Sequence, residues 1–173
     1  AKQGAEVSLI CATLGEAGLV DPRLLQDGQT IASLREQELR CSAEALGLKE
    51  VILLGYRDSG MQGSPDNNHP QALAAQKLEE VTDKIAGHMR VLQPDIVLTF
   101  DPFGGYGHPD HIRIHEAATR AFHLLRGELP AQSVRPFSRL YYHVMPPGFL
   151  RAAIFMTRLQ GKDPRKAGAN GDI

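Results

Sequence analysis

The sequence of 173 residues predicts an α/β fold, in which a parallel sheet is covered by helices on both faces. Short apolar runs without polar alternation carry this prediction, because such runs are typical of strands buried on both faces. Stretches with helical spacing of apolar residues separate them. The expected strands are residues 7–13, 51–54, 96–100 and 138–144, and the expected helices are 31–46, 71–92, 109–125 and 148–159.

The first residues, Ala1-Lys2-Gln3-Gly4, have the pattern of a helix end, since glycine accepts the left-handed conformation that follows a last helical turn. A strand follows at once, so the chain is expected to open inside a helix-to-strand connection. We therefore expect residues 1–173 to form a single Rossmann-like domain that is incomplete at its N-terminus, where the first strand–helix unit is missing, and incomplete at its C-terminus as well.

The composition excludes several classes of protein. The formal net charge of −1 argues against a nucleic-acid-binding protein, which would carry a basic excess. No apolar run approaches the roughly 20 residues of a membrane-spanning helix. Cys11 and Cys41 lie too far apart for a paired metal motif and are expected to be reduced thiols of a cytoplasmic protein. An oligomer is compatible with this composition.

Polar, glycine-bearing segments follow three of the predicted strands, at residues 14–18, 55–61 and 101–108. Ligands bind beyond the carboxyl ends of parallel strands, so we expect these segments to line one crevice. The richest motif is residues 99–111, which continues from the third segment into the next predicted helix and holds two histidines, an aspartate and a tyrosine within six residues. Imidazole binds zinc or transfers protons near neutral pH, and a carboxylate can orient a neighbouring imidazole. These candidates are Tyr106, His108, Asp110 and His111, with His115 as a less favoured metal ligand one helical turn further on.

The motif Gly105-Tyr106-Gly107-His108-Pro109-Asp110-His111 resembles the second signature of the PIG-L/LmbE-like deacetylases, which are metal-dependent enzymes that remove acyl groups from glucosamine-type amides. Thr13–Gly18 is similar to the turn after that family's second strand. Tyr56–Met61 is similar to the substrate loop of its mycothiol-type deacetylase and amidase branch. The resemblance extends to Gly161-Lys162-Asp163-Pro164.

The resemblance implies a Zn²⁺ cofactor and assigns roles to single residues. His111 would be a zinc ligand, and His108, tuned by Asp110, would protonate the leaving amine or stabilise the oxyanion. Tyr106 would hydrogen-bond the carbonyl oxygen of the amide. The substrate-binding candidates are Arg35 and Asp58, which match sugar-binding positions of the family. Arg57, the neighbour of Asp58, is a further candidate, and Glu16 either caps its turn or lines the pocket.

The sequence departs from the family at its first motif, Ala-His-Pro-Asp-Asp-Glu, which would supply two metal ligands and the general base. The other His-Pro pair, His69-Pro70, is followed by Gln71. A catalytic zinc needs about three protein ligands. We therefore expect an inactive fragment of a hydrolase that removes the N-acetyl group of a GlcNAc-type glycoside, a small-molecule substrate that resembles a low-molecular-weight-thiol precursor. The alternative is a non-catalytic carbohydrate- or nucleotide-binding module, although the glycines do not match a dinucleotide-binding fingerprint.

Overall fold

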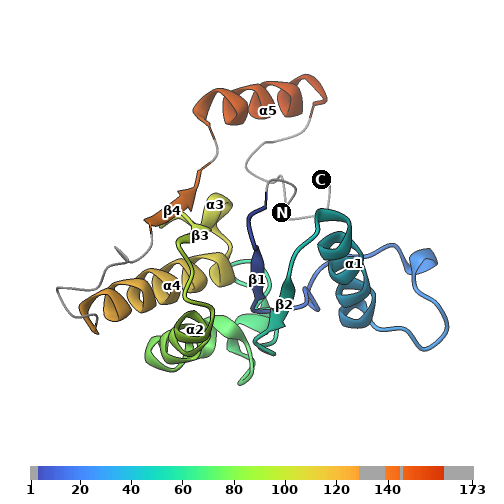
Figure 1. The fold of residues 1–173 in the computed structure, drawn as a ribbon. Coiled ribbons are helices and arrows are strands. Elements are labelled where there is room, and N and C mark those ends of the chain that lie inside the picture. The colour runs from blue at the N-terminus through green and yellow to red at the C-terminus, as the bar shows by residue number, and fades with distance from the viewer. Residues whose placement is uncertain (1–3, 129–138, 145, 162–173) are drawn as a thin grey trace.

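The structure is a computed structural model that describes residues 4–128, 139–144 and 146–161. Its strands and helices follow the predicted order (Figure 1). The strands are β1 (Ser8–Cys11), β2 (Glu50–Leu53), β3 (Ile96–Phe100) and β4 (Arg139–His143). The helices are α1 (Ile31–Leu46), α2 (Leu78–Leu92), α3 (Gly104–Gly107), α4 (Pro109–Glu128) and α5 (Pro147–Leu159), with short 3-10 turns at Pro22–Leu24, Pro65–Asn68 and Leu73–Ala75.

The four strands form two parallel pairs. β1 pairs with β2 in the register Leu9 to Val51, and β3 pairs with β4 in the register Leu98 to Tyr141. Among the described residues no strand joins β1 to β3, so the parallel sheet expected from the sequence is present as two separate halves. Figure 1 shows α2 and α4 together beneath the strands and α1 beside β2.

The bounds of α1 follow from its two caps. The side chain of Thr30 accepts a hydrogen bond from the backbone N–H of Ser33, and the side chain of Ser33 accepts one from the backbone N–H of Thr30, which satisfies donors of the first turn. Gly47 ends the helix in the left-handed conformation, with φ of 67°. Both ends agree with the predicted range 31–46.

The prediction for α2 was wrong at its start. Residues 71–77 were expected to be helical, but the backbone at Arg57 bonds to both sides of Ala72, with Arg57 N–H donating to Gln71 and Leu73 N–H donating to Arg57. Residues whose backbone groups are committed to another segment cannot form the first helical turn. The helix therefore begins at Leu78.

The core lies between α2, α4 and the strands. Its buried residues are Leu54, Leu73, Val81, Ile85, Ala86, Met89, Ala117, Ala118, Ala121 and Leu125. Small residues on α4 let that helix approach α2 closely. None of the helices in the described parts of the chain has the length and apolarity that crossing a membrane requires. The predicted helix end at Ala1–Gln3 and the similarity at Lys162–Pro164 lie outside the described residues.

Candidate active site

The three polar segments meet, as the sequence predicted. The carboxylate of Glu16, in the segment after β1, accepts a hydrogen bond from the backbone N–H of Asp58 at 3.0 Å. The next residue along, Ser59, donates its backbone N–H to Oδ2 of Asp110 at 3.1 Å. Two backbone N–H groups of the segment after β2 therefore bond to carboxylates, one in the segment after β1 and one in the first turn of α4, directly after the third segment. These bonds place the carboxyl ends of β1, β2 and β3 around one site.

The glycine-rich segment after β3 is held against the start of α4. Gly104 has φ of +66°, and a Cβ atom there would lie 2.9 Å from Cβ of His111 and 2.9 Å from the backbone nitrogen of Ile112. Only glycine fits such a position without displacing backbone. At Gly104 the backbone therefore packs closely against the first turn of α4.

The Nε2 atom of His111 carries an unshared lone pair, and no group of the described residues bonds to it. Its Nδ1 lies 3.1 Å from the carbonyl oxygen of Gly104, and because a carbonyl only accepts, Nδ1 carries the proton. The ring of Phe100 stacks on the imidazole, with centroids 4.0 Å apart and planes 7° apart. Burial lowers the pKa of His111, which favours the neutral form that a metal requires.

His108 has the opposite tautomer. Its Nδ1 accepts a hydrogen bond from the backbone N–H of Asp110 at 3.2 Å, so in the neutral ring the proton sits on Nε2. That Nε2 lies 3.9 Å from Oδ1 of Asp58. Burial lowers the pKa of His108, and the Asp58 carboxylate opposes this shift. His108 is therefore arranged to hold a proton where His111 is arranged to offer a lone pair.

Asp110 is the most deeply buried of the candidate residues, with 4% of its surface exposed. Burial raises the pKa of Asp110 from 3.8 to about 6, the N–H and hydroxyl groups of Ser59 oppose the rise, and the Asp58 carboxylate adds to it. Its Oδ1 is buried without a hydrogen-bond partner among the described residues. A buried oxygen of this kind is a position at which a proton, a water molecule or a cation would be stabilised.

Tyr106 closes one side of the group. Its ring meets His111 edge-on at a centroid distance of 5.2 Å and lies 6.0 Å from the ring of His108. The residue is 55% exposed, and partial burial together with Asp58 and Asp110 raises the pKa of its phenol. Its hydroxyl therefore stays protonated at neutral pH and can donate a hydrogen bond.

Ligands for a metal ion come from two parts of the site, the group of Asp58, His108 and Asp110 and the single residue His111. Asp58, His108 and Asp110 each offer a ligand atom, and these atoms lie within 4.8 Å of one another. However, the neutral His108 of this group has its proton on the nitrogen that faces Asp58. His111 offers an imidazole nitrogen that no described group occupies. The nitrogen and oxygen donors present fit zinc in type, and His111 is the better-prepared single ligand.

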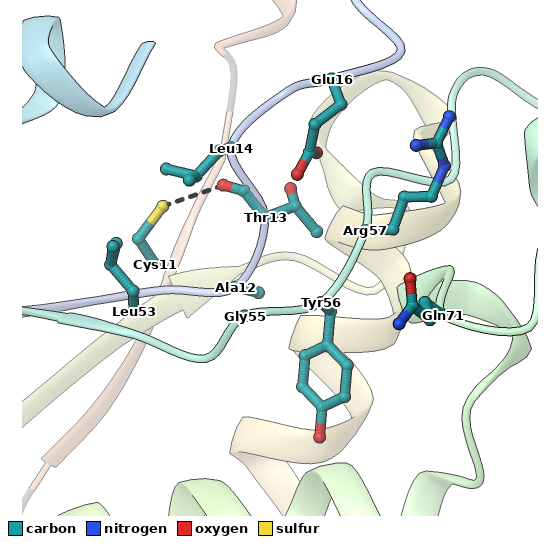
Figure 2. Close-up of a pocket in the computed structure, with 10 residues that line it drawn as sticks. All are labelled: Cys11, Ala12, Thr13, Leu14, Glu16, Leu53, Gly55, Tyr56, Arg57 and Gln71. Carbon is teal, nitrogen blue, oxygen red and sulfur yellow. Dashed lines mark hydrogen bonds between the residues drawn. The ribbon is translucent and has the colours of Figure 1, made fainter. Parts of the chain in front are cut away.

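A cavity of about 220 Å³, lined by polar and apolar residues alike, lies at the carboxyl ends of β1 and β2. Among the residues that line it, Figure 2 shows Glu16 and Arg57 above Tyr56, with Gln71 below Arg57. The guanidinium of Arg57 pairs with Asp66 at 2.7 Å, and this contact raises the pKa of Arg57. Its Nε is buried without a hydrogen-bond partner among the described residues. Glu16 connects the cavity to the histidines through its bond to Asp58.

Arg35 is the candidate that the structure does not bring to this group. It lies on α1, where its guanidinium pairs with Glu38 at 2.9 Å on the exposed side of the helix. Among the described residues, no hydrogen bond or ion pair connects Arg35 with the histidines. Its role in binding substrate stays a prediction.

Sequence reasoning missed two residues that build the site. Ser59 is fully buried and uses its backbone N–H for Asp110 and its hydroxyl for the backbone N–H of Ala74. Phe100 was assigned to a strand, but its ring supports His111. Phe100 directly precedes the polar segment 101–108, and Ser59 lies within the segment 55–61. Their positions in the sequence were the one indication that they belong to the site. His115, weighed as a less favoured metal ligand, bonds through Nδ1 to the carbonyl of Phe100 at 2.8 Å, and its role stays a prediction.

Comparisons with known proteins agree with this architecture. The sequence profile of the PIG-L family, described as GlcNAc-PI de-N-acetylase, matches residues 1–122. Two relatives share the name 1D-myo-inositol 2-acetamido-2-deoxy-alpha-D-glucopyranoside deacetylase. The one from Actinosynnema mirum is 39% identical over 130 residues, 70% of this chain and 46% of that protein. The one from Kineococcus radiotolerans is 43% identical over 143 residues, 74% of this chain and 40% of that protein. The chain thus spans less than half the length of these relatives.

Two solved structures share the fold. The conserved protein TT1542 from Thermus thermophilus superposes with a TM-score of 0.53 and 25% identity, over 83% of this chain and 55% of that one. The N,N'-diacetylchitobiose deacetylase from Pyrococcus horikoshii superposes with a TM-score of 0.55 and 24% identity, over 91% of this chain and 60% of that one. With the family profile matching more than two thirds of its residues, the chain belongs to the PIG-L family.

Proposed function

We propose that this chain forms one wall of the active site of a zinc-dependent N-deacetylase that acts on a GlcNAc-type glycoside. The observation that carries the proposal is the pair of opposite tautomers at the start of α4. His111 has its lone pair on Nε2, and His108 has its proton on Nε2. Amide hydrolysis uses both, a ligand that holds the metal on one side of the scissile bond and an N–H on the other that stabilises the oxyanion or, from the protonated ring, supplies the proton of the leaving amine.

His111 would hold the zinc ion through Nε2, which the contacts to Gly104 and Phe100 aim away from α3 and β3. When bound, zinc polarises the amide carbonyl and lowers the pKa of water toward about 7. A single imidazole is too small a ligand set for a catalytic zinc. The sequence holds no His-Pro-Asp-Asp string, so we propose that the remaining ligands and the general base come from outside residues 1–173.

His108 would stabilise the oxyanion by donating a hydrogen bond from Nε2, or, as the imidazolium, would protonate the leaving amine and return to the neutral ring. Asp110 positions the ring through its backbone N–H, and Asp58 faces the proton that is transferred. The protonated hydroxyl of Tyr106 would donate a hydrogen bond to the carbonyl oxygen as negative charge develops there. Each of these groups belongs to the segment after β2 or β3, where the fold delivers side chains to a ligand.

The cavity beside Asp58 would bind the hydroxyl groups of the sugar. Carboxylates and guanidinium groups hydrogen-bond hydroxyls well, and Glu16 and Arg57 supply one of each. The names of the curated relatives, which refer to a deacetylase of a GlcNAc–inositol glycoside, support a small glycoside of this kind as substrate. The cytoplasmic location expected from the sequence stays a prediction.

Two measurements test the proposal. The complete protein that contains residues 1–173 should release free amine from a GlcNAc–inositol glycoside in the presence of zinc. The absence of turnover with this glycoside, with diacetylchitobiose and with other GlcNAc glycosides would contradict the assigned reaction. The 173-residue chain alone should bind zinc weakly, and tight stoichiometric binding in a calorimetric titration would show that its own residues complete the metal site.

A further inference from the structure

A closed ring of hydrogen bonds connects α4 with the 3-10 turn Leu73–Ala75, which precedes α2. Ser59 donates its backbone N–H to Oδ2 of Asp110 at 3.1 Å, and its hydroxyl oxygen accepts the backbone N–H of Ala74 at 2.9 Å. The carbonyl oxygen of Ala74 accepts Nη2 of Arg113 at 2.8 Å. Asp110 and Arg113 are neighbours on one face of α4, so the ring begins and ends on the same helix.

Ser59 is fixed by every polar group that it has. The residue is fully buried, and its carbonyl accepts a hydrogen bond from Nδ2 of Asn67. A backbone N–H can only donate, so Ala74 uses a lone pair of the Ser59 hydroxyl, and the hydroxyl proton remains for the carboxyl of Asp110. This interaction lowers the pKa of Asp110, against the larger effect of burial. Two groups of Ser59 therefore meet the same carboxyl.

Arg113 closes the ring and differs in its contacts from Arg120, which lies two turns further along α4. The side chain of Arg113 is 23% exposed and bonds to the main-chain carbonyl of Ala74, with Glu116 at 3.5 Å from its other terminal nitrogen. The side chain of Arg120 is 53% exposed and pairs with Glu79 at 3.1 Å. An exposed ion pair contributes little, whereas a guanidinium bound to a main-chain carbonyl fixes where that backbone lies.

We propose that Ser59 and Arg113 are positioning residues for Asp110. Arg113 fixes the turn at Ala74, the turn fixes the hydroxyl of Ser59, and Ser59 holds the carboxyl of Asp110. Held in this way, Asp110 offers an oxygen within 4.8 Å of a ring nitrogen of His108. A displacement of about 1 Å in a catalytic site can lower the rate about 100-fold. The kinetic consequence rests on the proposed deacetylase function, but the ring of hydrogen bonds does not.

The kinetic test uses the complete, zinc-loaded protein and a GlcNAc–inositol glycoside. We expect kcat to fall about tenfold or more in Ser59→Ala and about threefold or more in Arg113→Met. The KM and the zinc affinity should stay within about twofold of the parent, because neither side chain contacts substrate or metal in the proposed site. This split separates positioning from a general loss of structure. A loss that appears in KM or in zinc binding overturns the proposal.

Two matched variants serve as controls. Arg120→Met removes a guanidinium from the same helix, and Thr82→Val removes a hydroxyl that is buried in α2 without a hydrogen-bond partner among the described residues. Both should keep kcat within about twofold of the parent. Losses in these controls as large as those in Arg113→Met and Ser59→Ala would contradict the assigned roles.

A double variant decides whether Arg113 acts through Ser59. Ser59→Ala already breaks the ring at the hydroxyl, so adding Arg113→Met should change kcat by no more than about twofold. Coupled residues on one path show such non-additive effects, whereas independent residues do not. If the two losses multiply, Arg113 affects the site by another route, and the proposed path is wrong.

Amide hydrogen exchange in the chelator-treated complete protein gives a readout that needs no activity. Arg113→Met should speed exchange of the Ser59 and Ala74 amides about tenfold or more, and Arg120→Met should leave both unchanged. The amide of Leu54, bonded to the carbonyl of Cys11, should exchange equally in all proteins. Unchanged exchange at Ser59 and Ala74 in Arg113→Met overturns the proposal. Faster exchange there with no turnover by the parent supports the ring and contradicts the proposed deacetylase function instead.

Discussion

The ring of Phe100, the last residue of β3, lies flat on the imidazole of His111, with centroids 4.0 Å apart. This contact links the end of a strand to the first turn of the following helix. Together with the bond from Nδ1 of His111 to Gly104, it fixes both the plane and the tautomer of the ring before any metal arrives. A ligand that is already oriented loses less conformational freedom on binding.

Replacing Phe100 with leucine should therefore weaken zinc binding in the complete protein by about two- to tenfold, since an aromatic pair contributes about 0.5–1.5 kcal/mol. Competition with a fluorescent chelator measures the change. Phe103→Leu is the matched control, because Phe103 is 65% exposed and does not stack on His111 in the described structure. Equal losses in the two variants would show that the stacking contact does not orient the ligand.

The two histidines should separate metal binding from proton transfer. In the complete protein, His111→Ala should abolish zinc binding at the zinc concentrations that saturate the parent. His108→Ala should keep zinc within a few-fold of the parent and reduce kcat about 100- to 10,000-fold, the usual range for loss of a general acid. Metal analysis and steady-state kinetics measure the two effects. Loss of zinc in His108→Ala would favour the rival metal group of Asp58, His108 and Asp110.

Gly104 and Gly105 provide a test of the close packing behind His111. Both have positive φ, 66° and 76°, so alanine at either position is strained by about 1–2 kcal/mol. Only at Gly104 would the new Cβ meet backbone and Cβ atoms at 2.9 Å, whereas space is open at Gly105. Gly104→Ala should lower the free energy of unfolding by at least about 1 kcal/mol more than Gly105→Ala, as measured by urea denaturation. Equal costs would contradict the packing described.

The stability of the metal-free chain should fall as pH rises through the titration of Asp110. Burial raises the pKa of this carboxyl to about 6 in the folded state, above its ordinary 3.8, so the folded state holds the proton more tightly. Its contribution to stability is full below about pH 4 and is lost as pH rises through about 6. The loss is on the order of 3 kcal/mol.

Asp110→Asn should remove that dependence and make the chelator-treated chain more stable than the parent near pH 8, since an amide can still accept the hydrogen bond from Ser59. Urea denaturation across the pH range measures both curves. Parallel curves for parent and variant would show that Asp110 is not the residue responsible.

Local signals predicted much of the fold. The helical spacing of apolar residues in 31–46 and the glycine after it gave the bounds of α1, and apolar runs located all four strands. The start of α2 could not be predicted, because the backbone of residues 71–73 is claimed by Arg57, a contact between loops. Tertiary pairing of this kind overrides local helix preference.

The candidate site shows the same division. The polar segment containing His108, Asp110 and His111 was evident from its residue types and its place after a strand. Which nitrogen of each ring carries the proton could not be read from the sequence, because the partners are the backbone groups of Gly104 and Asp110. Ser59 gave no local signal of its own role, since that role depends on an N–H aimed at another segment.

The assignment of opposite tautomers is the central claim, and long-range ¹H–¹⁵N NMR of the histidine rings tests it directly. Because burial lowers both pKa values, His108 and His111 should be neutral at about pH 7.5 in the metal-free chain. The account predicts a protonated Nε2 with a bare Nδ1 for His108, and a protonated Nδ1 with a bare Nε2 for His111. The same tautomer in both rings, or the reverse assignment, would contradict it.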